Sequence, residues 1–324
     1  MRRIILLGLV VLLVVGGLTI AWFYGAQLIR DEIAALANDE PSVNCGRLDI
    51  AGFPFRFDVT CGEARIVDLD LSISTPEIKA TALAYRPGHV IAFVQSPISI
   101  SDAFTGSERE LRFSLAETSL RLSGLLPQDW ELERLSILVD APTLHDLLIG
   151  DEVVLSAAKS ELHVTGGAAA GQEADGLAAF VSAEGLDYPE WDIAGGTATL
   201  TASLTHFPRK VLAWLGGNVL RDWQAAGGVL RLEDSSFAAG GMDINATGEA
   251  RLDDTGLPAG SLRVVSKGLI ERLDLSFLGD MRSLLIGTPD AEGRYTNQIA
   301  VRNGFVMAGV IPVPVLELAL EPFF

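Results

Sequence analysis

Few residues in this 324-residue sequence have types and spacing suited to catalysis or metal binding. Four histidines lack the spacing typical of metal ligands, which favours structural or surface roles: His89, His145, His163 and His206. Ser156-Ala157-Ala158-Lys159 matches the Ser-x-x-Lys pattern of penicillin-recognising enzymes. Those enzymes place the pattern at the start of a helix, whereas strand-like apolar residues flank it here. We therefore expect no enzyme activity, no catalytic residue, no cofactor and no metal.

Cys45 and Cys61 are the two cysteines of the sequence, and the residues between them suggest a hairpin that is symmetric about Phe53. If Gly52-Phe53-Pro54 forms the turn, Cys45 faces Cys61 across the two strands. This spacing predicts a disulfide in an exported protein, where disulfides persist. A closed loop of this length would stabilise the fold by about 3 kcal/mol in the chain-entropy model. The alternative is a pair of buried free thiols.

The composition is that of a folded protein with an acidic surface. Lys and Arg number 24 against 42 Asp and Glu, which gives a formal net charge of −18. Phosphate backbones should repel such a protein, so nucleic acid is a poor partner. Hydrophobic residues make up 49% of the chain and charged residues 20%, which excludes a disordered chain.

The N-terminus carries the strongest pattern, an apolar run over residues 4–24 behind the paired arginines of positions 2 and 3. As a helix, this run spans roughly 30 Å, the thickness of a bilayer core. Trp22 and Tyr24 fall where interfacial aromatic residues lie, and the positive-inside rule places the arginines in the cytoplasm. We expect a single-pass inner-membrane anchor with a periplasmic body. Cleavage of a signal peptide after Ala21 is the alternative.

From residue 43 onward the hydrophobic period changes to two, which is typical of antiparallel sheet with one apolar face. Alternating segments predicted as strands cover residues 67–74, 90–94, 198–204 and 242–252. Within the first segment, Asp68 and Asp70 are expected on a solvated face rather than in a catalytic dyad. The predicted fold is mainly β (α+β): a curved antiparallel sheet with covering helices, preceded by an N-terminal transmembrane helix.

Two segments with helical periodicity interrupt the strands, residues 208–224 and 269–285, and both are expected to cover the apolar face of the sheet. The predicted organisation is a membrane anchor or signal-anchor (1–25), a helical connector (26–41), an N-terminal β-rich part (42–165), a Gly/Ala-rich loop or boundary segment (166–195) and a C-terminal β-rich part with two helices (196–324).

Three motifs, in this order behind a short anchor, resemble domain-of-unknown-function family 2125: Gly52-Phe53-Pro54-Phe55-Arg56-Phe57-Asp58, Tyr85-Arg86-Pro87-Gly88-His89-Val90-Ile91-Ala92 and Asp254-Thr255-Gly256-Leu257-Pro258-Ala259-Gly260-Ser261-Leu262. The resemblance covers most of the chain after residue 30 and implies a proteobacterial cell-envelope protein with no assigned activity. It also implies structural turns at Gly52-Phe53-Pro54 and at Pro87-Gly88. A looser similarity to AsmA-like envelope proteins covers the last hundred residues.

Two function classes remain open at this point. A module that binds a lipid or another hydrophobic ligand would use an apolar trough left by small strand residues such as Ala82 and Ala246. Ile270, Phe277 and Met281 would form its wall or lid. An envelope interaction scaffold would instead have a filled core and an exposed patch for other envelope proteins. An apolar cavity open to solvent distinguishes the first class from the second.

Overall fold

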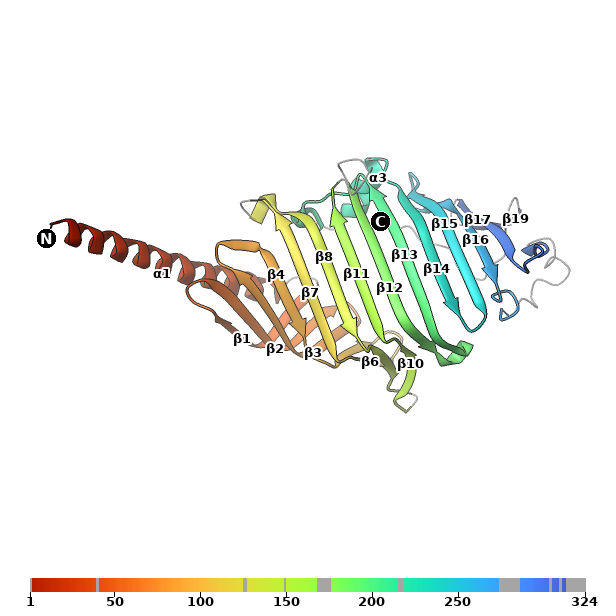
Figure 1. The fold of residues 1–324 in the computed structure, drawn as a ribbon, viewed down its shortest axis with the longest axis horizontal. Coiled ribbons are helices and arrows are strands. Elements are labelled where there is room, and N and C mark those ends of the chain that lie inside the picture. Colours follow the sequence, from red (N-terminus) through yellow and green to blue (C-terminus); the bar gives the residue numbers. More distant parts are fainter. Residues whose placement is uncertain are drawn as a thin grey trace. The chain divides into compact units, whose positions relative to one another are not determined.

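The computed structural model of the protein describes residues 2–38, 41–124, 127–148, 150–167, 176–214, 218–273, 286–302, 305–308 and 311–312. Strands dominate these residues and their described pairings are antiparallel, so the prediction of a mainly β fold behind an N-terminal helix is confirmed (Figure 1). The chain divides into two compact units. The first comprises Met1–Leu120 and Pro142–Val153, and the second comprises Arg121–Ala141 and Val154–Phe324.

The first unit begins with one continuous helix, α1 (Arg2–Leu36), which is about 52 Å long. Between Ile5 and Ile20 its large apolar side chains are 51% to 75% exposed, whereas Trp22 and Ala26 are buried. Among the described residues, α1 is the helix that is long and apolar enough to cross a membrane. One part of this helix is therefore bare and apolar, and the next part packs on the body.

The strands of the first unit are β1 (Ser42–Ala51), β2 (Arg56–Asp68), β3 (Leu71–Leu83), β4 (Arg86–Val94), β5 (Ile98–Asp102), β6 (Ser107–Arg112) and β9 (Thr143–Asp146). Two more strands, β7 (Leu115–Ser123) and β10 (Glu152–Ser156), have residues in both units. β2 lies between β1 and β3, and β3 pairs with both β4 and β5. β6 then joins β5 to β9.

One face of this sheet is apolar, as the alternation over residues 90–94 predicts. Ala82 of β3 pairs with Phe57 of β2 and with Val90 of β4, so the three side chains lie on the same face. The helix covers part of this face, because Phe57 packs against the buried Trp22 and Ala26. Ala82 is therefore a cross-strand neighbour of the residues on which α1 packs.

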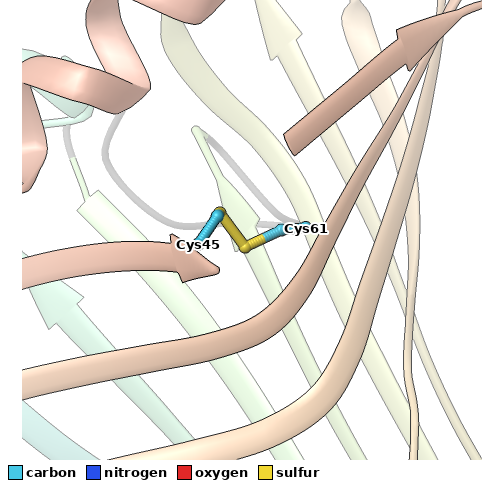
Figure 2. The surroundings of a disulfide bond; sticks show 2 residues. All are labelled: Cys45 and Cys61. Atoms are coloured by element: carbon cyan, nitrogen blue, oxygen red, sulfur yellow. A yellow bond between two sulfur atoms is a disulfide. The ribbon is translucent and has the colours of Figure 1, made fainter. Parts of the chain in front are cut away.

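The hairpin of β1 and β2 contains the disulfide Cys45–Cys61, with 5.2 Å between the two Cα atoms (Figure 2). The predicted register is wrong, however. Cys45 lies opposite Ala64 and Cys61 lies opposite Leu48, so the cysteines are three positions out of register. Three residues of flat strand would separate them by about 10 Å. The ribbon must therefore bend between them, at Glu63, whose φ is +52°.

The turn between β1 and β2 is where the first motif predicts it. Gly52 has a φ of +97°, a conformation that favours glycine, and a Cβ at this position would lie 2.7 Å from the carbonyl oxygen of Arg56. Phe53 and Pro54 follow in the turn, and the peptide bond between them is cis.

The second predicted turn is wrong, because Pro87 and Gly88 lie inside β4 and the turn residues are Ala84 and Tyr85. The register of β3 against β4 shifts by three residues next to Ala82, which leaves the segment with Pro87 and Gly88 out of the ladder. Proline has no N–H to donate, so a bulge of this kind tolerates it better than a regular strand does.

The segment 67–74, predicted as one strand, is a hairpin. β2 ends at Asp68 and β3 begins at Leu71, while Leu69 and Asp70 form the turn between them. Leu69 has a φ of +50° and is 85% exposed. Apolar and polar residues alternate in both strands and also across the two-residue turn, so the sequence pattern does not reveal the turn. Asp68 and Asp70 are both exposed, as expected for a solvated pair.

The second unit is a series of strands, each paired with the next (yellow through green to blue in Figure 1). They are β8 (Glu131–Asp140), β11 (Lys159–Gly166), β12 (Gly176–Tyr188), β13 (Ile193–Thr205), β14 (Leu230–Ala239), β15 (Met242–Leu252), β16 (Pro258–Lys267), β17 (Tyr295–Arg302), β18 (Phe305–Ala308) and β19 (Ile311–Pro312). The predicted strands over residues 198–204 and 242–252 are confirmed.

The helices of the second unit are short. They are η1 (Pro127–Asp129), η2 (Pro189–Trp191), α2 (Val211–Trp214) and α3 (Val219–Ala225). The prediction of a single helix over residues 208–224 is therefore wrong, because two short helices form there and Asn218 is not helical. Two glycines lower the helix propensity of this segment. α3 lies at one end of β13 (Figure 1), where the indole N–H of Trp223 donates to the carbonyl of Thr205 at 2.8 Å.

Candidate functional site

The part of the chain that the structure describes contains no group of three His, Cys, Asp or Glu residues able to hold a metal ion. An ion-pair network surrounds Arg112 in the first unit. Its guanidinium pairs with Glu110 and with Asp151 (Nη2 to Oδ1, 2.9 Å), and Asp151 also contacts Nδ1 of His145 at 3.0 Å. The hydrogen bonds from Arg112 hold the pKa of Asp151 below its ordinary value. Nε2 of His145 also lies 3.2 Å from the hydroxyl of Thr143, which donates to the carbonyl oxygen of Arg112 at 3.4 Å, so these contacts join the paired strands β6 and β9.

A hydroxyl, an imidazole and a carboxylate meet on the second unit. The Ser136 hydroxyl lies 3.0 Å from Nδ1 of His163, and Nε2 of His163 lies 3.4 Å from the carboxylate of Glu161. Lys159 binds the same carboxylate at 2.5 Å and lowers the pKa of Glu161. An acyl-transfer site also needs N–H groups aimed at an oxyanion, but the ladder of β8 and β11 uses the strand amides.

The apolar face of the second unit has the dimensions of a ligand site. A solvent-open hollow of about 430 Å³ lies on this face of five neighbouring strands, β13 to β17. Most of its lining residues alternate along the strands: Leu200, Ala202, Leu230, Leu232, Gly248, Ala250, Pro258, Gly260, Leu262, Ile299 and Val301; Glu249, Ala259 and Ser261 complete the lining. Sites for small ligands typically enclose about 300–1,000 Å³ and have mostly apolar walls.

Side-chain size explains why the hollow exists. Gly248, Ala250 and Gly260 lie on adjacent positions of β15 and β16 and add little or no side chain to the face. Leucines such as Leu232 and Leu262, the cross-strand partners of Gly248, rise beside them. Small residues thus form the floor of the hollow and large ones form its sides.

A second hollow of about 340 Å³ has an aromatic lining: Leu155, Leu186, Tyr188, Trp191, Ile193, Phe237, Met242 and Ile244. Ile244 and Gly248, which line different hollows, are four residues apart on β15 and therefore point to the same side of the sheet. Four residues of strand cover about 13 Å. Ala246 lies between them on that side, so the two hollows follow one another along the same face of the sheet.

A family model described as "Uncharacterized protein conserved in bacteria (DUF2125)" matches residues 22–316. The chain belongs to the DUF2125 family. The resemblance predicted from the three motifs is therefore confirmed, and the match includes the β1–β2 hairpin and both hollows. It starts at Trp22, the buried residue of α1 that packs on the body. No curated protein and no solved structure matches this DUF2125 chain.

The trough residues predicted from the sequence fall in different parts of the DUF2125 chain. Ala82 belongs to the first unit and Ala246 to the second, each on an apolar face of the strands of its unit. Ile270 is 8% exposed in a turn after β16, whereas Phe277 and Met281 lie outside the described residues.

The sequence analysis missed the residues that line the larger hollow. A signal for three of them was present in the third motif, where Pro258, Gly260 and Leu262 alternate with Ala259 and Ser261. The motif resembles the family pattern, and in the structure Pro258, Gly260 and Leu262 line the hollow together with the intervening Ala259 and Ser261. The other lining residues come from strands far apart in the sequence, which no local pattern connects.

Proposed function

We propose that this protein is anchored in the inner membrane, has its body in the periplasm, and binds a lipid or another hydrophobic ligand on the apolar face of its second unit, without catalysis. The pair of hollows carries this proposal. A scaffold without a ligand would fill its core, whereas this face has solvent-open spaces of about 430 and 340 Å³ with apolar walls. Within the second unit, Ser136, His163 and Glu161 are not among the residues that line either space, which supports binding rather than chemistry.

The anchor rests on α1. Its bare stretch from Ile5 to Ile20 is apolar on all sides, which is costly in water and favourable in a bilayer core. Two arginines precede it, and the positive-inside rule then directs the body out of the cytoplasm. The disulfide Cys45–Cys61 supports the same direction, because disulfides persist in oxidising compartments.

We expect the membrane-extracted protein to retain α1. Intact-mass measurement of the mature protein should give a mass that includes residues 4–21. Trp22 has its partners within the body, so cleavage after Ala21 would leave the packed part of the helix in place. A mature N-terminus at Trp22 would therefore show a soluble exported body and contradict the anchor.

A second prediction concerns the larger hollow. Ala250→Trp should fill the space beside Gly260 and reduce lipid co-purification at least several-fold, because the indole occupies the volume that an acyl chain would use. Native mass spectrometry of the detergent-extracted protein measures the bound lipid.

Thr247→Trp is the matched control, because Thr247 is exposed on the opposite face of the same strand. The control should retain both fold and lipid. Equal lipid in the two variants would exclude the hollow as the site. Unfolding of Ala250→Trp alone, with Thr247→Trp intact, would show that small residues serve close packing, and the scaffold hypothesis would then hold.

A further inference from the structure

We infer a second membrane contact in the first unit, next to the point where α1 meets the body. It consists of five exposed aromatic side chains, here called the aromatic cap: Phe23, Tyr24, Phe53, Phe55 and Tyr85. The cap lies in the headgroup layer of the bilayer that α1 spans. This inference rests on the membrane anchor of the proposed function and extends it to the body of the protein.

The length of the exposed apolar part of α1 sets the depth of the aromatic cap relative to the bilayer. Residues 5–21 rise about 26 Å, close to the thickness of a hydrocarbon core. The next residue, Trp22, has its ring centroid 5.5 Å from that of Phe53, and Phe23 stacks on Phe53 at 5.9 Å. The turn of the hairpin is therefore beside the helix at the height where the span ends.

Packing holds this turn against α1. The indole N–H of Trp22 donates to the carbonyl oxygen of Arg56 at 2.8 Å, and the Trp22 ring stacks on Phe57. The amide N–H of Ala84, in the neighbouring turn, donates to the carbonyl oxygen of Phe55 at 2.9 Å. Both turns are thus joined to the helix, and their exposed side chains project from the same junction.

The exposed side chains have the chemistry of an interfacial belt. Phe55 is 66% exposed and Tyr85 is 75% exposed, although aromatic residues of this size gain much from burial. Tyrosine is enriched where the bilayer meets water, and arginine places its charge among lipid phosphates. Arg56 and Arg86 flank the cap. Arg56 pairs with Asp58 (Nε to Oδ2, 2.6 Å), whereas Arg86 has no ion pair among the described residues.

Exposure alone does not identify the aromatic cap as a membrane contact, because large apolar residues are also exposed at the opposite end of the same strands. Leu69 is 85% exposed and Phe104 is 86% exposed, and the amide of Ala103 joins their two turns. This end lies at the far end of β2, about 40 Å along the strand from the cap. It is far from the bare part of α1 and nearer the C-terminal end of that helix, because Ser42, six residues after Leu36, pairs with Val67 at this end of β2. It therefore provides an internal control.

Single-cysteine variants of the full-length protein test the contact. Phe55→Cys reports on the cap, Phe104→Cys on the opposite end and Leu12→Cys on α1. Both natural cysteines are in the disulfide, so the introduced thiol is the one that takes an environment-sensitive fluorophore. Each labelled protein is placed in vesicles of phosphatidylcholine and phosphatidylglycerol that carry a nitroxide either on the headgroup or midway along the acyl chain.

We expect the headgroup nitroxide to remove most of the fluorescence at position 55, the chain nitroxide to do so at position 12, and neither to affect position 104. Tyr85→Cys gives an independent measurement from the neighbouring turn and should behave as Phe55→Cys does. If positions 55 and 85 are as unquenched as position 104 while position 12 is quenched, the cap does not contact the membrane and the anchor stands. If position 12 is unquenched as well, the anchor and the cap contact both fail.

Discussion

Replacement of Trp22 by alanine is expected to lower the free energy of unfolding of the first unit by about 3–5 kcal/mol, the usual cost of truncating a buried tryptophan. Trp22 is 7% exposed and contacts the rings of Phe53 and Phe57. Its indole N–H also donates to a backbone carbonyl, that of Arg56. Truncation removes these contacts together, so α1 should separate from the hairpin. Thermal unfolding in one detergent, compared with the unmodified protein, measures the loss.

A pair of glycines in the same helix provides a matched test of the docking. A Cβ on Gly25 would lie 2.9 Å from Cζ of Phe57, whereas a Cβ on Gly8 would meet nothing within 4 Å. Gly25→Leu should therefore destabilise the first unit and Gly8→Leu should not. Equal stability of the two variants would show that α1 does not pack on the body as described.

Replacement of both Cys45 and Cys61 by serine is expected to lower the stability of the first unit by about 3 kcal/mol, because the unfolded chain regains the freedom of the closed loop. For a unit of this size, that loss corresponds to a fall in Tm of roughly 10–13 °C. Calorimetry of the double variant beside the oxidised protein measures the shift.

Chemical reduction of the unmodified protein is the control for this substitution. Reduction should lower Tm by about as much as the double replacement, since both open the same loop. Non-reducing peptide mapping should recover the peptides of Cys45 and Cys61 linked to one another. Complete alkylation of both thiols without a reductant would contradict the bond.

Local patterns predict local structure well in this chain. The alternation of Met242, Ile244, Ala246, Gly248, Ala250 and Leu252 predicts a strand with one apolar face, and β15 is that strand from its first residue to its last. A strand places its side chains on alternate sides whatever its neighbours are, so the prediction needs no tertiary information. The same argument fails at Leu69 and Asp70, because a tight hairpin continues the alternation of two strands through its turn.

Pairing between strands is harder to predict. The positions of Cys45 and Cys61 suggest a hairpin that is symmetric about Phe53, but the ladder places Cys45 opposite Ala64. A bend at Glu63 brings the cysteines together in spite of this offset. Spacing in the sequence predicts which residues form the bond, whereas the register depends on the packing of both faces of the hairpin.

The sequence by itself determined the apolar helix, the predominance of antiparallel strands, the cysteine pair and the family resemblance. The first three follow from residues that are close together in the chain, and the family resemblance follows from three short motifs and their order. Tertiary structure decided which part of α1 is bare and which part packs, because the burial of Trp22 depends on Phe53 and Phe57 of a later hairpin. It also decided where the hollows lie. The larger hollow is the space that side chains of five paired strands leave unfilled on one face, and this space depends on the register of those strands.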